Sequence, residues 1–146
     1  MIIIVDANIF FSALISPAGK IGEIIAEPFS PAKMMSCHYA FIELFKHQPK
    51  ILKYAKRPQN ETLDILYKLF QYIEFYSQTL IEEKYWQEAD RLTIGVDSFD
   101  MCYVALALQT EGWLWTGDKK LTEHLKSMGF NRVINTAELY DQLGIK

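Results

Sequence analysis

The chain has 146 residues, of which 50% are hydrophobic and 14% aromatic, and it carries a formal net charge of −3. This composition excludes an intrinsically disordered chain, and no apolar run approaches the roughly 18 residues of a membrane span. The acidic balance also excludes nucleic-acid binding through bulk positive charge. We expect one globular domain over residues 1–146, and a cytoplasmic protein, because no basic region precedes a long apolar stretch.

Hydrophobic periodicity predicts strands that alternate with helices along the chain. Proline residues mark the expected ends of helices. Pro28 and Pro49 are each expected to end a helix, and Asn60 is expected to cap the next one. The predicted elements are strand 2–6, helix 7–16, helix 20–27, strand 32–37, helix 38–47, helix 60–72, strand 73–77, helix 79–92, helix 98–111, strand 113–117, helix 119–130, strand 133–135 and helix 136–144. This alternation predicts an α/β fold with a parallel sheet that helices cover on both faces.

Two predicted strands end directly in an aspartate. The run Ile2–Val5 leads into Asp6, and the run 113–117 leads into Asp118. Ligands of parallel sheets gather at the carboxyl ends of the strands, where loops and helix N-termini meet. We therefore expect these two carboxylates to lie at one edge of the sheet.

Three further acids are candidates for the same edge. Glu43 stands inside the apolar segment "YAFIELF", and Asp97 and Asp100 lie three residues apart at the start of a helix. Crowded carboxylates take up protons or require a cation, and oxygen ligands favour Mg²⁺ or Mn²⁺. The alternative is that the aspartates only cap helices and that Glu43 points to solvent.

Positive charge is concentrated near these acids. Five Lys or Arg residues and no acid lie between Lys46 and Arg57. The candidates for contacting a phosphate backbone are Lys50, Lys53, Arg57 and Lys119, and the alternative is a solvated face. Cys37 and Cys102 have no metal-ligand spacing, and they are expected to be buried free thiols.

Four acidic segments resemble the successive motifs of the PIN-domain nucleases. They are "IIIVDANIFFSAL", the helix that carries Glu43, "DSFDMCYVALAL" and "WLWTGDKKL". The length is similar to that of the VapC-type toxins of bacterial toxin-antitoxin pairs. The resemblance implies a PIN-like three-layer sandwich with about five strands in the order 3-2-1-4-5. It also implies RNA cleavage that depends on Mg²⁺ or Mn²⁺, an antitoxin partner and a homodimer.

The resemblance also assigns roles to individual residues. Four acids match the family's catalytic and metal-binding positions in chain order: Asp6, Glu43, Asp100 and Asp118. Asp97 matches an additional acid before the third position, and Asn8 and Thr116 match polar positions that flank the first and fourth acids.

Other functions with the same sheet edge stay open. One is a PIN fold that binds RNA or protein without cutting. The others are a haloacid-dehalogenase-like phosphatase and a receiver domain, which also carry an aspartate after the first strand. The phosphatase needs a second aspartate at the position of Asn8, and the receiver needs a lysine where the late strand ends in Asp118.

Overall fold

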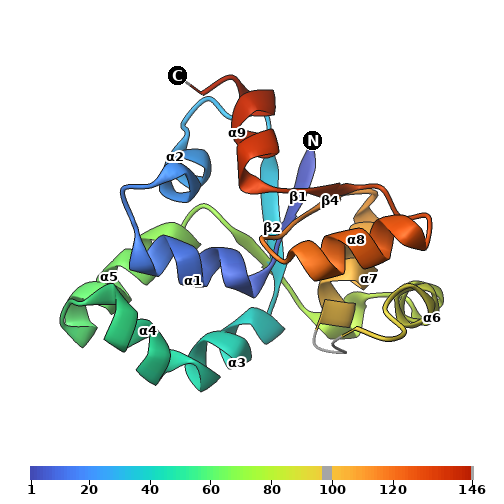
Figure 1. Cartoon of the computed structure of the whole chain (residues 1–146), viewed down its shortest axis with the longest axis horizontal. Coiled ribbons are helices and arrows are strands. Elements are labelled where there is room, and N and C mark those ends of the chain that lie inside the picture. The colour runs from blue at the N-terminus through green and yellow to red at the C-terminus, as the bar shows by residue number, and fades with distance from the viewer. Residues whose placement is uncertain (97–99, 146) are drawn as a thin grey trace.

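A parallel sheet forms the centre of the protein (Figure 1). The computed structural model describes residues 1–96 and 100–145, and within them the sheet has five strands in the order β3-β2-β1-β4-β5. The strands are β1 (Ile2–Val5), β2 (Lys33–Cys37), β3 (Glu74–Tyr76), β4 (Trp113–Trp115) and β5 (Val133–Ile134). This confirms the predicted sheet, and its order differs from the 2-1-3-4-5 order of receiver domains.

The central strand β1 is buried because both of its neighbours are strands and helices cover its faces. Ile3, Ile4 and Val5 have no exposed surface. Ile4 pairs with Met35 of β2 on one side and with Leu114 of β4 on the other. Burying an aliphatic side chain contributes about 1.5–3 kcal/mol, so the apolar run itself holds β1 in the middle of the sheet.

The helices pack on both faces of the sheet. They are α1 (Ala7–Ile15), α2 (Lys20–Ala26), α3 (Tyr39–Lys46), α4 (Gln48–Ala55), α5 (Gln59–Phe70), α6 (Glu83–Leu92), α7 (Met101–Thr110), α8 (Lys119–Ser127) and α9 (Thr136–Leu143), with a short 3₁₀ turn η1 (Gln78–Leu80). α7 packs against β1, β2 and β4 with α6 alongside it, whereas α1 packs among α2, α3, α4 and α5 (Figure 1). No single helix in the described residues is long and apolar enough to cross a membrane; the pair α1 and α2 passes the same test together but is bent by 113°.

The prediction missed one helix and misplaced one cap. The helix before Pro49 ends at Lys46, close to the predicted end, but a further helix, α4, begins at Gln48 and has Pro49 in its first turn, where its missing N–H costs nothing. Asn60 is not a cap, because α5 begins at Gln59 after Pro58 and has no side-chain capping bond. The predicted start of α7 at Ser98 lies outside the described residues, as does Asp97.

Gly112 allows a close approach between the end of α7 and the start of β1. A Cβ atom on Gly112 would lie 3.0 Å from Cγ2 and 3.1 Å from the carbonyl oxygen of Ile2. A larger residue at this position would therefore require Ile2 or Thr110 to move. Because α7 runs antiparallel to the strands, its first residues lie at their carboxyl ends.

Candidate active site

Asp6 is a buried carboxylate held from two sides. Only 3% of its surface is exposed. Thr116 Oγ1 donates a hydrogen bond to Asp6 Oδ2 at 2.8 Å, and the backbone N–H of Asn8 lies 3.5 Å from Oδ1. The backbone N–H of Asp6 donates to the carbonyl of Trp115 at 3.1 Å. The end of β4 thus fixes the carboxylate that follows β1.

Thr116 and Asn8 connect this carboxylate to the second strand-end acid. Thr116 Oγ1 accepts from Asn8 Nδ2 at 3.3 Å and from the backbone N–H of Asp118 at 3.1 Å. Asn8 Oδ1 accepts from the N–H of Gly117 at 3.3 Å. Asp118 caps α8, since its Oδ1 accepts from the N–H of Leu121 at 3.0 Å. The two predicted auxiliary residues therefore tie the two acids together.

Asp6 is difficult to ionise in this surrounding. Burial raises the pKa of Asp6 from 3.8 to about 6, and the negative charge of Asp118 adds to the rise. Hydrogen bonds from Thr116 and Asn8 lower the pKa but do not compensate. The charged form would be favoured by a cation beside these two acids.

Asp100 and Asp118 line a common pocket of about 210 Å³. The lining residues are Gly95, Val96, Asp100, Asp118, Lys120 and Leu121. Asp100 stands at the N-cap position of α7. Lys120 lines this pocket, whereas the adjacent Lys119 was the predicted phosphate-binding residue. The sequence alone does not distinguish these two neighbouring lysines.

Glu43 and Asp6 both influence a buried tyrosine, Tyr103, through their charges. Glu43 is half-buried on α3, and its Oε1 atom is buried. Burial, and next the charge of Glu43, raise the pKa of Tyr103, with Cys102 and Asp6 adding to the rise. Tyr103 itself has no exposed surface. Glu43 is thereby linked electrostatically to the same buried side chain as Asp6.

The acids fit a divalent ion through their chemistry and not through a ready-made cage. Within residues 1–96 and 100–145, no group of three or more His, Cys, Asp or Glu side chains is arranged to hold a metal. Mg²⁺ is commonly bound by only one or two carboxylates together with water and substrate phosphate. The donors are oxygen atoms, and Asp6 and Asp118 repel each other, as a cation site of this kind requires.

The two cysteines take no part in this arrangement. Both are buried and free, which confirms the prediction. A hydrogen bond with Cys37, and then burial, raise the pKa of the Cys102 thiol. The thiolate that would bind metal or act as a nucleophile is therefore disfavoured.

The predicted phosphate-binding residues divide into two kinds. Lys50 and Lys53 are exposed on α4, and Lys119 is exposed at the start of α8. Arg57 instead donates from Nη1 to the carbonyl of Leu14 at 2.6 Å, and so closes the end of α1. Part of the Arg57 guanidinium is therefore engaged in a contact within the protein.

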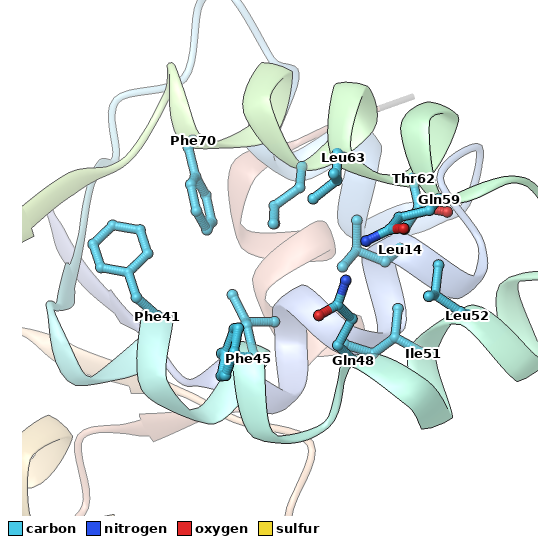
Figure 2. A pocket seen from close by; sticks show the side chains of 12 residues that line it. Leu14, Phe41, Phe45, Gln48, Ile51, Leu52, Gln59, Thr62, Leu63 and Phe70 are labelled. Atoms are coloured by element: carbon cyan, nitrogen blue, oxygen red, sulfur yellow. The ribbon is translucent and has the colours of Figure 1, made fainter.

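A second hollow, the α3–α5 groove, is lined by none of the candidate acids (Figure 2). It has a volume of about 420 Å³ and is lined by Leu14, Phe41, Leu44, Phe45, Gln48, Ile51, Leu52, Gln59, Thr62, Leu63, Leu66 and Phe70. Figure 2 shows Phe41, Phe45 and Phe70 around one end, and Gln48 and Gln59 at the other. Phe45 is 77% exposed and Leu63 is 51% exposed, so the groove leaves apolar surface open to solvent.

Tyr103 was not predicted as a site residue, because a tyrosine in an apolar helix has the pattern of a core residue. Its hydroxyl is buried and has no hydrogen-bond partner among the described residues. A buried hydroxyl without a partner costs about 1–3 kcal/mol. Tyr103→Phe should therefore raise the free energy of unfolding by about 1 kcal/mol in urea denaturation. Tyr140→Phe is the control, because its hydroxyl donates to Glu23 at 2.7 Å and its loss should not stabilise the protein. A Tyr103→Phe protein that is less stable than the wild type would show that the hydroxyl is satisfied.

Comparisons with known proteins agree with the geometry. The family profile described as "PIN domain" matches residues 4–135. No curated protein sequence matches the chain. A chain of VapBC2 from Rickettsia felis, bound to a DNA fragment from its promoter, superposes with a TM-score of 0.69 at 15% identity, covering 92% of this chain and 98% of that one. A chain of VapBC-1 from nontypeable Haemophilus influenzae has a TM-score of 0.63 at 14% identity, covering 94% and 99%.

Proposed function

Because this chain belongs to the PIN-domain family, we propose that it is a cytoplasmic ribonuclease that hydrolyses RNA phosphodiester bonds with Mg²⁺ or Mn²⁺, as the toxin of a toxin-antitoxin pair. The observation that carries the proposal is the buried Asp6, which Thr116 holds beside Asp118 at the carboxyl ends of β1 and β4. Asp6 also caps α1, but capping does not require a carboxylate that is costly to ionise beside a second acid. Such a carboxylate suits a site that operates with a cation.

The chain's own residues hold and orient the reacting groups in this proposal. Asp6, Asp118, Asp100 and Glu43 would hold the ion, which when bound neutralises phosphate charge and lowers the pKa of a water molecule. Thr116 keeps Asp6 in one orientation through the 2.8 Å bond, and Asn8 supports Thr116. Asp97 is proposed as an auxiliary acid. Lys50, Lys53, Arg57, Lys119 and the pocket residue Lys120 would contact phosphates of the strand.

The direct test is cleavage of a labelled single-stranded RNA by the purified protein. We expect cleavage with Mg²⁺ or Mn²⁺, none in EDTA, and recovery when the metal is restored. RNA binding without cleavage at any metal concentration would support the alternative of a PIN fold that only binds. Release of phosphate from small phosphomonoesters would support the phosphatase alternative, which the Asn8 position disfavours.

An antitoxin would cover the α3–α5 groove. The two similar structures are VapBC complexes by name, and we extend that association to this chain as part of the proposal. The groove offers open apolar surface from Phe45 and Leu63, and exposed lysines of α4 lie beside it. These features suit an amphipathic helix with acidic flanking residues. The homodimer also stays a prediction, and the molar mass of the purified protein in solution tests it.

Phe45→Asp should prevent an antitoxin from binding without unfolding the protein, because the side chain is largely exposed. The partner to test is the product of a reading frame that abuts this gene, co-expressed with the wild type and the variant. We expect the variant to bind the partner with an affinity at least about tenfold lower, which is equivalent to about 1.4 kcal/mol of binding free energy. Phe29→Asp is the matched control, since Phe29 is 91% exposed and lies outside the groove. Equal loss in both variants would contradict the assignment of this groove.

A further inference from the structure

A small pocket, the α1–α4 pocket, adjoins the acidic site on the side of α1. Its volume is about 270 Å³, and its lining residues are Asn8, Phe11, Ser12, Ile15, His47, Lys50, Ile51 and Tyr54. Asn8 belongs to both places, because its Nδ2 lies 3.3 Å from Thr116 Oγ1, which bonds to Asp6. On the opposite wall, the backbone N–H of His47 donates to the carbonyl of Glu43 at 3.1 Å. The pocket therefore lies between α1, which follows Asp6, and α4, which follows the helix that carries Glu43.

The side chains of this pocket combine aromatic rings with positive charge. The rings of Phe11 and His47 meet edge to face with centroids 5.2 Å apart. Tyr54 is 51% exposed, and Lys53 Nζ lies 5.7 Å from the centre of its ring. Lys50 completes the wall, and the lining that the structure describes contains no acid. Aromatic faces, a cation and the polar groups of Asn8 and Ser12 are the means by which proteins bind unstacked nucleotides.

The dimensions limit the ligand further. Pockets for drug-sized molecules have volumes of about 300–1,000 Å³, so a cavity of about 270 Å³ takes one base with its sugar and not two stacked bases. A base inside a duplex is stacked on both sides and cannot enter. An anionic strand is favoured by Lys50 and Lys53, whereas a metal ion is disfavoured by them.

We propose that the α1–α4 pocket is a nucleotide subsite that binds one unpaired base of RNA next to the phosphate held at the acids. This inference rests on the ribonuclease function proposed above. It adds that the substrate must be single-stranded at that position. It also assigns specificity-determining contacts to Tyr54, His47 and Phe11, none of which is among the acids of the sequence motifs.

The test is a binding measurement that requires no cleavage. Fluorescence anisotropy with labelled single-stranded RNA hexamers in EDTA gives the dissociation constant for each variant. Tyr54→Ala should weaken binding by about tenfold, which is the usual loss when a stacking ring is removed. Tyr54→Phe should retain affinity because it keeps the ring. Tyr72→Ala is the matched control, since Tyr72 is 54% exposed and lies outside the pocket.

Two further measurements locate the base and the charge. A set of hexamers carries one abasic nucleotide at each position in turn. At one position, removal of the base should weaken binding to the wild type but should cause no additional loss of affinity in Tyr54→Ala. Lys50→Gln should reduce the salt dependence of binding by about one ion, whereas Lys50→Arg should restore it. A double-stranded RNA of the same sequence should bind more weakly than the single strand.

The outcomes separate this inference from the proposed function. Equal affinities for Tyr54→Ala and Tyr72→Ala, an abasic scan without a preferred position, or a wild type that binds no single-stranded RNA would each overturn the subsite. If the wild type cleaves RNA while Tyr54→Ala binds normally, the ribonuclease stands and the subsite fails. If the base-dependent binding appears without any cleavage, the pocket binds nucleotides and the ribonuclease proposal fails.

Discussion

Asp6→Asn and Asp118→Asn should each lower metal-dependent RNA cleavage by about a hundred- to a thousandfold while the fold survives. Both side chains stand at the carboxyl ends of central strands, and both are proposed to hold the ion. The substitution preserves the shape of the side chain but removes the charge that binds a hard cation. The expected loss corresponds to roughly 3–4 kcal/mol of the barrier, which is a reasonable share for metal-ion catalysis.

The controls for this experiment are available in the same chain. Asp141→Asn removes a carboxylate from the exposed surface of α9 and should leave cleavage unchanged. Circular dichroism and the melting temperature verify that each variant is folded. Thr116→Val should lower activity less than Asp6→Asn, because it removes the bond that orients Asp6 but leaves the carboxylate. Full activity in purified Asp6→Asn would remove this residue from the mechanism.

The stability of the metal-free protein should fall as the pH rises from about 4 through about 6. The reason is Asp6, whose pKa in the folded protein is about 6 because burial, aided by the charge of Asp118, raises it from 3.8. A group with a raised folded pKa binds its proton more tightly in the folded state, so its contribution is lost as the proton leaves. A difference of about two units corresponds to roughly 3 kcal/mol.

The measurement is thermal or urea unfolding in EDTA from pH 4 to pH 8, compared between wild type and Asp6→Asn. The variant should lack this component of the slope, and above pH 7 it should melt higher than the wild type. Mg²⁺ or Mn²⁺ at ten times its dissociation constant should stabilise the wild type by about 1.4 kcal/mol, or about 3–6 °C, and the variant little. Identical pH slopes and no metal effect up to millimolar ion would mean that Asp6 only supports the local structure.

The strands could be predicted because their sequence signals were local and strong, whereas their order came from the family resemblance. The run Ile2–Val5 has the pattern of a fully buried strand, and the family resemblance supplied its central place. The helix α4 could not be predicted, since Pro49 in a sequence marks either the end of one helix or the first turn of the next. Tertiary packing determines that a helix begins there, because α4 packs on α1 and its residues Ile51 and Ala55 are buried.

The candidate site divides in the same way. Asp6 and Asp118 were identifiable because each follows an apolar run, and the polar neighbours Asn8 and Thr116 prove to bond with them. The buried hydroxyl of Tyr103 and the residues that line the α1–α4 pocket could not be predicted, because their surroundings depend on which helices pack together. Tyr54 and Phe11 are 43 positions apart in the sequence and share a cavity only after α4 packs on α1.

The hydrogen bond between Thr116 and Asp6 joins residues that are 110 positions apart in the sequence. In the sheet, β1 lies between β2 and β4, and β4 comes much later in the chain. During synthesis the chain emerges from the ribosome with its amino-terminal segments first. The first strand and Asp6 therefore appear early, but the partner strand, Thr116 and Asp118 appear only when most of the chain has been translated. A nascent or prematurely terminated chain that stops before β4 lacks one acid and the hydroxyl that orients the other. Translation itself thus delays the assembly of the proposed site until the protein is nearly complete, so fragments of the chain would lack the activity proposed here.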